Sequence, residues 1–255
     1  MRADSYNVSM VISDAIQTLE RELREVFGSR LQSLVVYGQR AQSHRDAHEH
    51  PHAAHGHDAA PTHTLAIVDA MTPGDLRACA VRVDAWHESG LATPLLIAAH
   101  EFERSLDAFP FEFGAILADH TVIAGVNPFA ALAVDPADLR RACEVQARSH
   151  LLHLREGYLE TRGRADALSV LIVRSAAAFA ALVTSVARLE GHATDDVASA
   201  ARHVERVLGA PCAVAEVAAL VGVHDISSAE AERLFGPYLD AVTRLVKHVD
   251  GWGAR

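Results

Sequence analysis

The chain has 255 residues, half of them hydrophobic and 22 % charged, which is the composition of a folded globular protein and excludes general disorder. Its formal net charge of −10 argues against sequence-independent binding of nucleic acids, because such binding needs Lys and Arg to neutralise phosphates. The three cysteines, Cys79, Cys143 and Cys212, are far apart and form no CxxC pair. They argue against a disulfide framework and against a thiolate zinc site, and they fit a reducing cytoplasm.

The first half of the chain alternates helical and strand patterns. Apolar residues recur every three or four positions over 10–27 and predict an amphipathic helix, and a β-rich run over 34–38 ends in Gly38. Thr72 is the expected N-cap of the next helix. The pattern further predicts strands at 64–68, 95–97 and 121–124, and helices at 73–88 and 101–108. Helices and strands in alternation predict a small α/β sheet layer.

The second half changes to helices alone. Asp135-Pro136 has the cap and the first-turn proline of a helix start. Helices are predicted from there over 136–161, 165–190, 195–208, 212–221 and 228–249. Gly236-Pro237 should kink or split the last of them. We therefore expect two domains, an α/β domain over 1–130 and an all-α helical bundle over 131–255.

Two segments bear on membrane association. Residues Met1–Ser9 are polar and lack the apolar region of a signal peptide. Residues Leu168–Ala187 are strongly apolar, but Arg174 among them would cost at least about 2.5 kcal/mol in mid-bilayer, which favours a buried helix of a bundle. We expect a cytoplasmic protein with no membrane and no nucleic-acid partner. The apolar helices over 165–190 and 212–221 leave a homodimer open.

A helix, a strand that ends in Tyr37-Gly38, a loop and a second strand form the opening of the nucleotidyltransferase fold. Together with the stretches Thr93–Ile97, Phe109–Phe113 and Val122–Phe129, they give the chain a resemblance to the DNA polymerase beta superfamily. More narrowly, it resembles bacterial nucleotidyltransferase-domain proteins of about this size that have an all-helical C-terminal half. The resemblance implies a small mixed sheet with helices, followed by a bundle that can form one wall of an acceptor cleft.

The motif that carries catalysis in that superfamily is altered in this chain. Active members have Gly-Ser after the first strand and two carboxylates, two residues apart, at the start of the second, where they hold the Mg²⁺ that bridges the triphosphate. By position, Gly38 matches the glycine, Gln39 replaces the serine, and Thr62 and Thr64 replace the carboxylates. Two neutral hydroxyls do not substitute for two anions around Mg²⁺, and the third strand, 95–97, adds no acid.

These substitutions favour a catalytically degenerate nucleotidyltransferase fold to which no catalytic residue is assigned. The four motif positions would then be degenerate nucleotide-binding positions in a binding or scaffold protein, with a nucleotide or another small molecule as the ligand. The alternative is a divergent enzyme that retains Mg²⁺-dependent transfer, in which Asp58 or Asp69 supplies a carboxylate.

Seven of the 16 histidines fall within 44–63, in the loop where such a fold holds its phosphates. Neutral imidazoles are good ligands for Zn²⁺ and Ni²⁺. The tract therefore raises the hypothesis of a transition-metal-binding protein with the ligands His48, His50, His52, His55 and His57. The alternative is a solvated low-complexity loop, because Ala, Gly and Pro dilute the tract. The other nine histidines are scattered singly and indicate no site.

Arg148 and His153 have a spacing that resembles the Arg-x4-His motif of HEPN-type ribonucleases, which occur beside nucleotidyltransferase folds. Residues five apart do not share one helix face, and both residue types are common on solvated faces. The pair therefore does not favour a ribonuclease over the hypotheses above.

Overall fold

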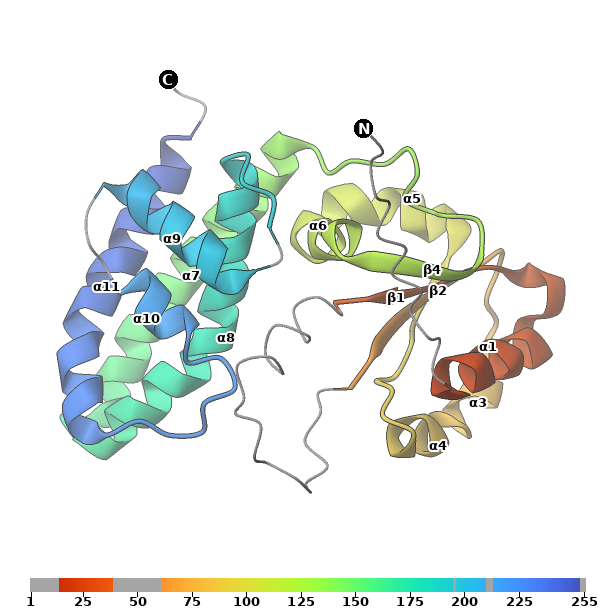
Figure 1. Ribbon diagram of the computed structural model, residues 1–255, viewed down its shortest axis with the longest axis horizontal. Coiled ribbons are helices and arrows are strands. Elements are labelled where there is room, and N and C mark those ends of the chain that lie inside the picture. The colour runs from red at the N-terminus through yellow and green to blue at the C-terminus, as the bar shows by residue number, and fades with distance from the viewer. Residues whose placement is uncertain (1–13, 39–60, 195, 210–212, 253–255) are drawn as a thin grey trace, which may run out of the picture. The chain divides into compact units, whose positions relative to one another are not determined.

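The computed structural model describes residues 14–38, 61–194, 196–209 and 213–252 (Figure 1). These residues fall into two compact units, each of which is described by itself. The first unit holds 14–38, 61–103 and 120–131, and the second holds 104–119 and 132–252. The protein thus has a mixed α/β unit with a four-stranded sheet and a helical unit that includes the C-terminal region.

The sheet of the first unit has the strand order β3-β2-β1-β4. β1 is antiparallel to both of its neighbours, whereas β2 and β3 are parallel. The end of β1 and the starts of the other strands therefore meet at one end of the sheet, which we call the Tyr37 end. All the strands predicted from the sequence are present, as β1 (Leu31–Tyr37), β2 (His63–Val68), β3 (Leu95–Ala98) and β4 (His120–Gly125).

One face of the sheet packs against a helix layer made of α1 (Asp14–Phe27), α3 (Pro73–Ala80) and α4 (Val83–Glu88). Every second strand residue points to this layer, because side chains along a strand alternate between the two faces. The single helix predicted over 73–88 is two helices, with a turn in which the Arg82 N–H donates to the Cys79 carbonyl at 2.9 Å. The core between sheet and helices comprises Leu34, Val36, Ala66 and Val68 of the strands and Ile16, Leu19, Leu23, Phe27, Cys79 and Trp86 of the helices.

An ion pair fixes the start of α3. Both terminal guanidinium nitrogens of Arg30 donate to the Asp75 carboxylate, each at 2.8 Å. Thr72 is the N-cap that the sequence predicts, and it forms a capping box with Asp75. The hydrogen bonds from Arg30 and Thr72 hold the pKa of the Asp75 carboxyl well below its usual range. This acid therefore serves the fold of the first unit.

The second unit is built from helices: the end of α5 (Ala99–Ala108), α6 (Pro110–Ala118), α7 (Pro136–Thr161), α8 (Ala165–Leu189), α9 (Val197–Leu208), α10 (Val214–Ala218) and α11 (Ser228–Asp250). α7, α8 and α11 pack on one another around fully buried side chains such as Phe179 and Tyr238. α6 has no predicted counterpart. α11 runs through Pro237 as one helix, so of the two predicted effects, a kink or a split, the split does not occur. Buried residues on both sides of the proline, such as Leu234 and Ala241, hold the helix in the bundle despite its missing N–H.

α8 is the one helix in the described part of the chain that is long and apolar enough to cross a membrane. Half of its apolar window is buried inside the structure. The buried side chains include Ile172, Phe179 and Val183, and α8 packs against α7, α9 and α11, whereas Arg174 is exposed. A core helix of a bundle has these contacts, as the sequence predicts for this segment.

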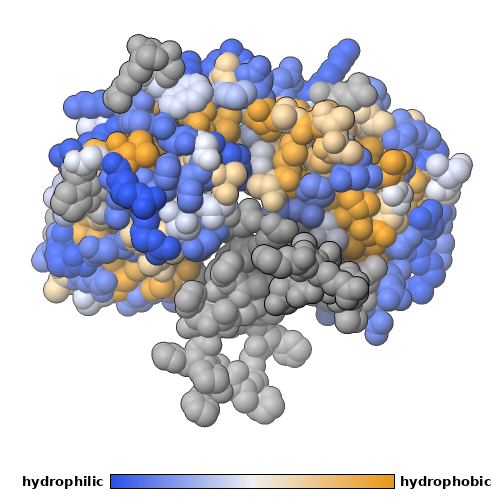
Figure 2. Space-filling view, turned by 45° about the horizontal axis from the view of Figure 1, so that its top comes forward, coloured by the Kyte–Doolittle hydropathy of each residue, from blue (hydrophilic) through white to orange (hydrophobic). Residues whose placement is uncertain are grey.

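Hydrophobic side chains also reach the surface, as the orange atoms in Figure 2 show. Scattered apolar residues are normal on a protein surface, but some on α7 are regularly spaced. Val145, Leu152 and Leu159 are between 62 % and 75 % exposed and recur every seven residues, which puts them on one helix face. A second copy of the chain could cover this face, and the homodimer stays a prediction.

Candidate functional site

The Tyr37 end of the sheet carries the positions that the sequence predicts for nucleotide binding. Gly38 directly follows β1 and has a φ of +73°, a conformation that side chains disfavour. Among the described residues, no atom lies within 4 Å of the place where a Cβ would stand, so the backbone conformation, and not crowding by these residues, favours glycine here. Several predicted residues lie outside the described part of the chain, namely Gln39, Asp58 and the metal ligands His48, His50, His52, His55 and His57.

Thr62 and Thr64, at the start of β2, have different surroundings. The Thr62 N–H donates to the Gly90 carbonyl and the Thr62 carbonyl accepts from the Ala92 N–H, both at 2.9 Å, so Thr62 ties β2 to the segment before β3. Thr64 pairs with Val36 and shares its face of the sheet, so it points into the helix layer. Thr64 is 1 % exposed, and its hydroxyl is sealed without a hydrogen-bond partner in the described residues. It is a core residue, out of reach of a ligand on the opposite face.

The sealed hydroxyl of Thr64 predicts a stabilising substitution. Valine has nearly the same shape and no polar atom, so Thr64→Val should raise the free energy of unfolding of the first unit by about 1–2 kcal/mol. The control is Thr161, which is also buried but donates its hydroxyl to the Tyr158 carbonyl at 2.7 Å, so that Thr161→Val should cost stability. Chemical denaturation followed by circular dichroism measures both. A loss of stability in Thr64→Val would mean that the hydroxyl makes a bond the protein needs.

The face of the Tyr37 end opposite the helix layer carries a row of rings. His63, Tyr37 and His120 are register partners on β2, β1 and β4, so they lie side by side across the sheet. The rings of Tyr37 and His63 stack with their centroids 5.6 Å apart. The His120 ring lies 4.6 Å from that of Phe129, which lies 5.4 Å from that of Phe102. We call these residues the aromatic row.

The aromatic row passes from an exposed ring to buried rings. His63 is exposed, Tyr37 and His120 are half-buried, and Phe129 and Phe102 are buried. Burial raises the pKa of the Tyr37 hydroxyl, so this ring is a neutral phenol at physiological pH. The row therefore offers aromatic rings of the kind that stack on a nucleobase or another planar group.

Carboxylates are missing from the strands themselves, since no residue of β1, β2, β3 or β4 is an Asp or Glu. Asp69 follows Val68, which pairs with Leu31 at the end of the sheet away from Tyr37. In the described residues, no group of three or more His, Cys, Asp or Glu is placed to hold a metal ion. His63 and His120 lie on the two strands that flank β1, with Tyr37 between them.

The second unit contains polar clusters that the sequence does not indicate. His150 of α7, Ser175 of α8 and Tyr238 of α11 form a chain of hydrogen bonds. His192 and His203 stack with their centroids 4.5 Å apart. Histidines that are scattered in the sequence are thus brought together with other groups by the packing of distant helices. The apolar spacing around His150, which places it on the inner side of its helix, is the one sequence signal that could have found it.

Arg148 and His153 do not form a common site. Arg148 donates to the Asp250 carboxylate of α11 at 2.8 Å and to Glu144 of its own helix at 3.4 Å. His153 is 75 % exposed, and its Nδ1 lies 3.4 Å from the Glu156 carboxylate. Arg148 is thus held by carboxylates of the helical unit, whereas His153 lines a cavity between α7 and α8 that Arg148 does not line.

Comparison with known proteins adds no functional assignment. No protein-family model matches the chain, and no curated protein matches it. The function has to be inferred from the chemistry of the residues themselves.

Proposed function

We propose that the first unit has a nucleotidyltransferase-like fold that binds a nucleotide or another planar ligand without transferring a nucleotidyl group. The observation that carries this proposal is the make-up of the Tyr37 end, with rings on the face opposite the helix layer and no carboxylate on any strand. Nucleotidyl transfer needs a divalent metal held by carboxylates, whereas stacking on a ring needs none.

The topology of the first unit supports the fold part of the proposal. A helix precedes β1 and a glycine follows it, and β2 is antiparallel to β1 and joined by helices to the parallel β3. The resemblance of the sequence to the nucleotidyltransferases implies this order of elements. In that fold Gly38 corresponds to the motif glycine, and Thr62 to a position where active members hold their metal.

In the proposed complex, a base stacks beside Tyr37 and His63. Base–aromatic stacking contributes about 1–3 kcal/mol per base. No strand of the sheet carries an Asp or Glu to hold Mg²⁺ against the phosphates, so the triphosphate is expected to contribute little to binding. We therefore expect weak binding that changes little from a nucleoside monophosphate to the triphosphate.

Removing the Tyr37 ring should weaken this binding. Tyr37→Ala is expected to lower the affinity for ATP by roughly five- to 150-fold, which corresponds to about 1–3 kcal/mol for one stacked base. His100→Ala, which changes an exposed histidine of the same unit outside the aromatic row, should leave the affinity unchanged. Isothermal titration calorimetry measures the affinities, and circular dichroism verifies the fold of each variant. Equal affinities of the wild type and Tyr37→Ala would exclude the aromatic row as the binding site.

The divergent enzyme is tested by label transfer. Incubation with labelled nucleoside triphosphates, Mg²⁺ or Mn²⁺ and candidate acceptors should transfer no label under the proposal. Transferred label would overturn it, and the variants Asp58→Asn and Asp69→Asn would then show which carboxylate the reaction uses.

A second candidate function is the binding of a transition metal by the histidine tract, 44–63. Its last member, His63, is exposed and pairs with Tyr37, so the segment between these two residues starts and ends at one point of the sheet. Calorimetry with Zn²⁺ or Ni²⁺ should detect a one-to-one site tighter than micromolar, which disappears when 43–58 is replaced by a Gly-Ser linker. Weak uptake at many sites would count against this function.

A further inference from the structure

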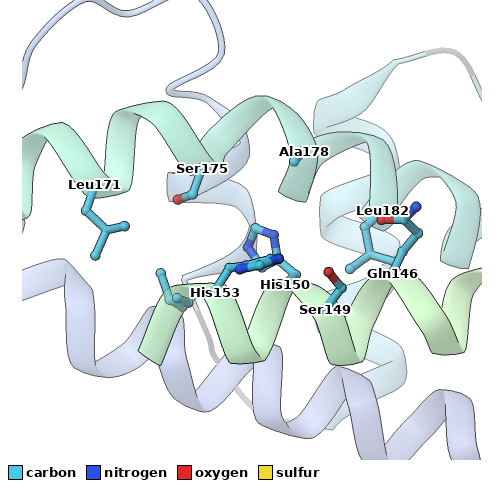
Figure 3. Close-up of a pocket in the computed structure, with 9 residues that line it drawn as sticks. Gln146, Ser149, His150, His153, Leu171, Ser175, Ala178 and Leu182 are labelled. Atoms are coloured by element: carbon cyan, nitrogen blue, oxygen red, sulfur yellow. The ribbon is translucent and has the colours of Figure 1, made fainter. Parts of the chain in front are cut away.

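A cavity of about 260 Å³ lies between α7 and α8 of the second unit (Figure 3). No Asp, Glu, Lys or Arg is among the residues that line it. Its volume is a little below the roughly 300–1,000 Å³ of sites for drug-sized molecules. Its wall is apolar at Leu154, Leu171 and Leu182. The polar side chains beside these leucines include His150, His153 and Ser175.

A chain of hydrogen bonds leads into the wall of this cavity. His150 Nε2 lies 2.6 Å from the Tyr238 hydroxyl, which lies 3.0 Å from Ser175 Oγ. Ser175 donates its hydroxyl proton to the Ile172 carbonyl at 2.9 Å. Each hydroxyl has only one proton, so Tyr238 then donates to Ser175, and His150 donates through Nε2 to Tyr238.

This order of donors determines what His150 offers to the cavity. Burial lowers the pKa of His150 to about 4, so the ring is neutral at physiological pH. With the ring proton on Nε2, the other nitrogen, Nδ1, is an acceptor. Nδ1 has no hydrogen-bond partner in the described residues, and it is not sealed from solvent. A molecule that displaces water from the cavity has to satisfy this acceptor.

Packing around the cavity fixes these groups in place. Tyr238 is fully buried, its ring packs edge-on against Phe179, and Phe179 stacks on His150. At Gly157 the two helices are so close that a Cβ would lie 2.5 Å from Leu171 Cδ1. The site is therefore formed in the folded protein, which lowers the entropic cost of binding.

We propose that this cavity binds a small uncharged molecule that has an apolar body and a hydroxyl or N–H donor. The body packs against the leucines of the wall, and the donor binds Nδ1 of His150. The site consists of residues of the second unit alone. Binding at this cavity is therefore independent of nucleotide binding at the Tyr37 end.

Indole and 1-methylindole are matched probes for this site, because they have similar apolar bodies and only indole has an N–H donor. Each is titrated into the full-length protein with ¹⁵N-labelled histidine, and NMR follows the ring nitrogens of His150. Indole should bind saturably, shift the His150 signals and bind at least tenfold more tightly than 1-methylindole.

Substitutions on the exposed side of α8 locate the binding. Ala178 lines the cavity and is exposed, so Ala178→Phe should fill the cavity without disturbing the core and lower the affinity for indole at least tenfold. Ala178→Leu is a smaller change of the same kind. Ala177→Phe is the matched control, because Ala177 is exposed on the same helix but does not line the cavity, and it should keep the wild-type affinity.

Several results would overturn the proposal. They are a lack of saturable indole binding, equal affinities for the two probes, or wild-type affinity in the Ala178 variants. Loss of indole binding in Tyr37→Ala, with the Ala178 variants unaffected, would place the probe on the aromatic row and would equally contradict a site at His150.

Discussion

Gly125→Ala is expected to destabilise the first unit severely. Gly125 ends β4 with a φ of +80°, and a Cβ there would lie 1.8 Å from the Gln32 carbonyl oxygen and 3.1 Å from Ser33 Cα. The left-handed conformation alone costs an L-residue about 1–2 kcal/mol. The clash is with backbone, which cannot rotate away, so β4 has to separate from β1. The total loss in free energy of unfolding should exceed about 3 kcal/mol, among the larger effects of single substitutions.

Gly28→Ala is the matched control for this prediction. Gly28 also has a positive φ, +57°, but no atom of the residues that the structure describes lies within 4 Å of the position of its Cβ. Gly28→Ala should therefore lower the free energy of unfolding by only about 1–2 kcal/mol, which is the cost of the left-handed conformation itself. Trp86 is buried in the first unit, so its fluorescence during urea denaturation, in a Trp252→Phe background, follows this unit. Equal losses in the two variants would mean that β4 does not approach β1 as closely as described.

Acid should destabilise the second unit through His150. Burial lowers the pKa of this imidazole in the folded protein to about 4, from an ordinary value of 6.5. Between these pH values the unfolded chain binds a proton that the folded protein does not. The contribution of neutral His150 to stability is therefore complete above about pH 6.5 and is lost as the pH falls towards 4, by up to about 3 kcal/mol.

The variant His150→Gln isolates this effect, because it cannot titrate and its amide can still bond to Tyr238. The difference in unfolding free energy between the wild type and His150→Gln should shift in favour of the variant as the pH falls from 6.5 to 4. His224→Gln, which changes an exposed histidine of the same unit, should follow the wild type. Parallel stability curves for the wild type and His150→Gln would show that folding does not lower the pKa of His150.

Most of the helices in the second unit could be predicted from the sequence, because their ends carry local signals. The Asp135 side chain caps α7 by accepting from the Ala137 N–H, and the bounds of α7 are those predicted. α6 was not predicted, because its short apolar run shows no helical period of apolar and polar residues. Pro110 is in fact its first-turn residue, where a missing N–H does no harm.

The faces of the sheet could not be predicted in the same way. All residues of β2 from Thr64 to Val68 are buried, so the strand shows no alternation of polar and apolar residues. Pairing with Val36 is what places Thr64 in the helix layer and leaves His63 beside Tyr37. The aromatic row and the chain from His150 to Tyr238 join residues from distant parts of the sequence, and only tertiary packing brings such residues together.

The measurement that tests the central claim most directly is a calorimetric titration of ATP into the full-length protein, in excess Mg²⁺ and again in EDTA. Because no strand of the sheet carries a carboxylate to hold the metal, saturable binding with the same dissociation constant is expected in both conditions. Binding that requires Mg²⁺ would show that the protein assembles a metal site for the triphosphate. Such a result, or a lack of any saturable binding, would contradict a nucleotide-binding unit that dispenses with metal.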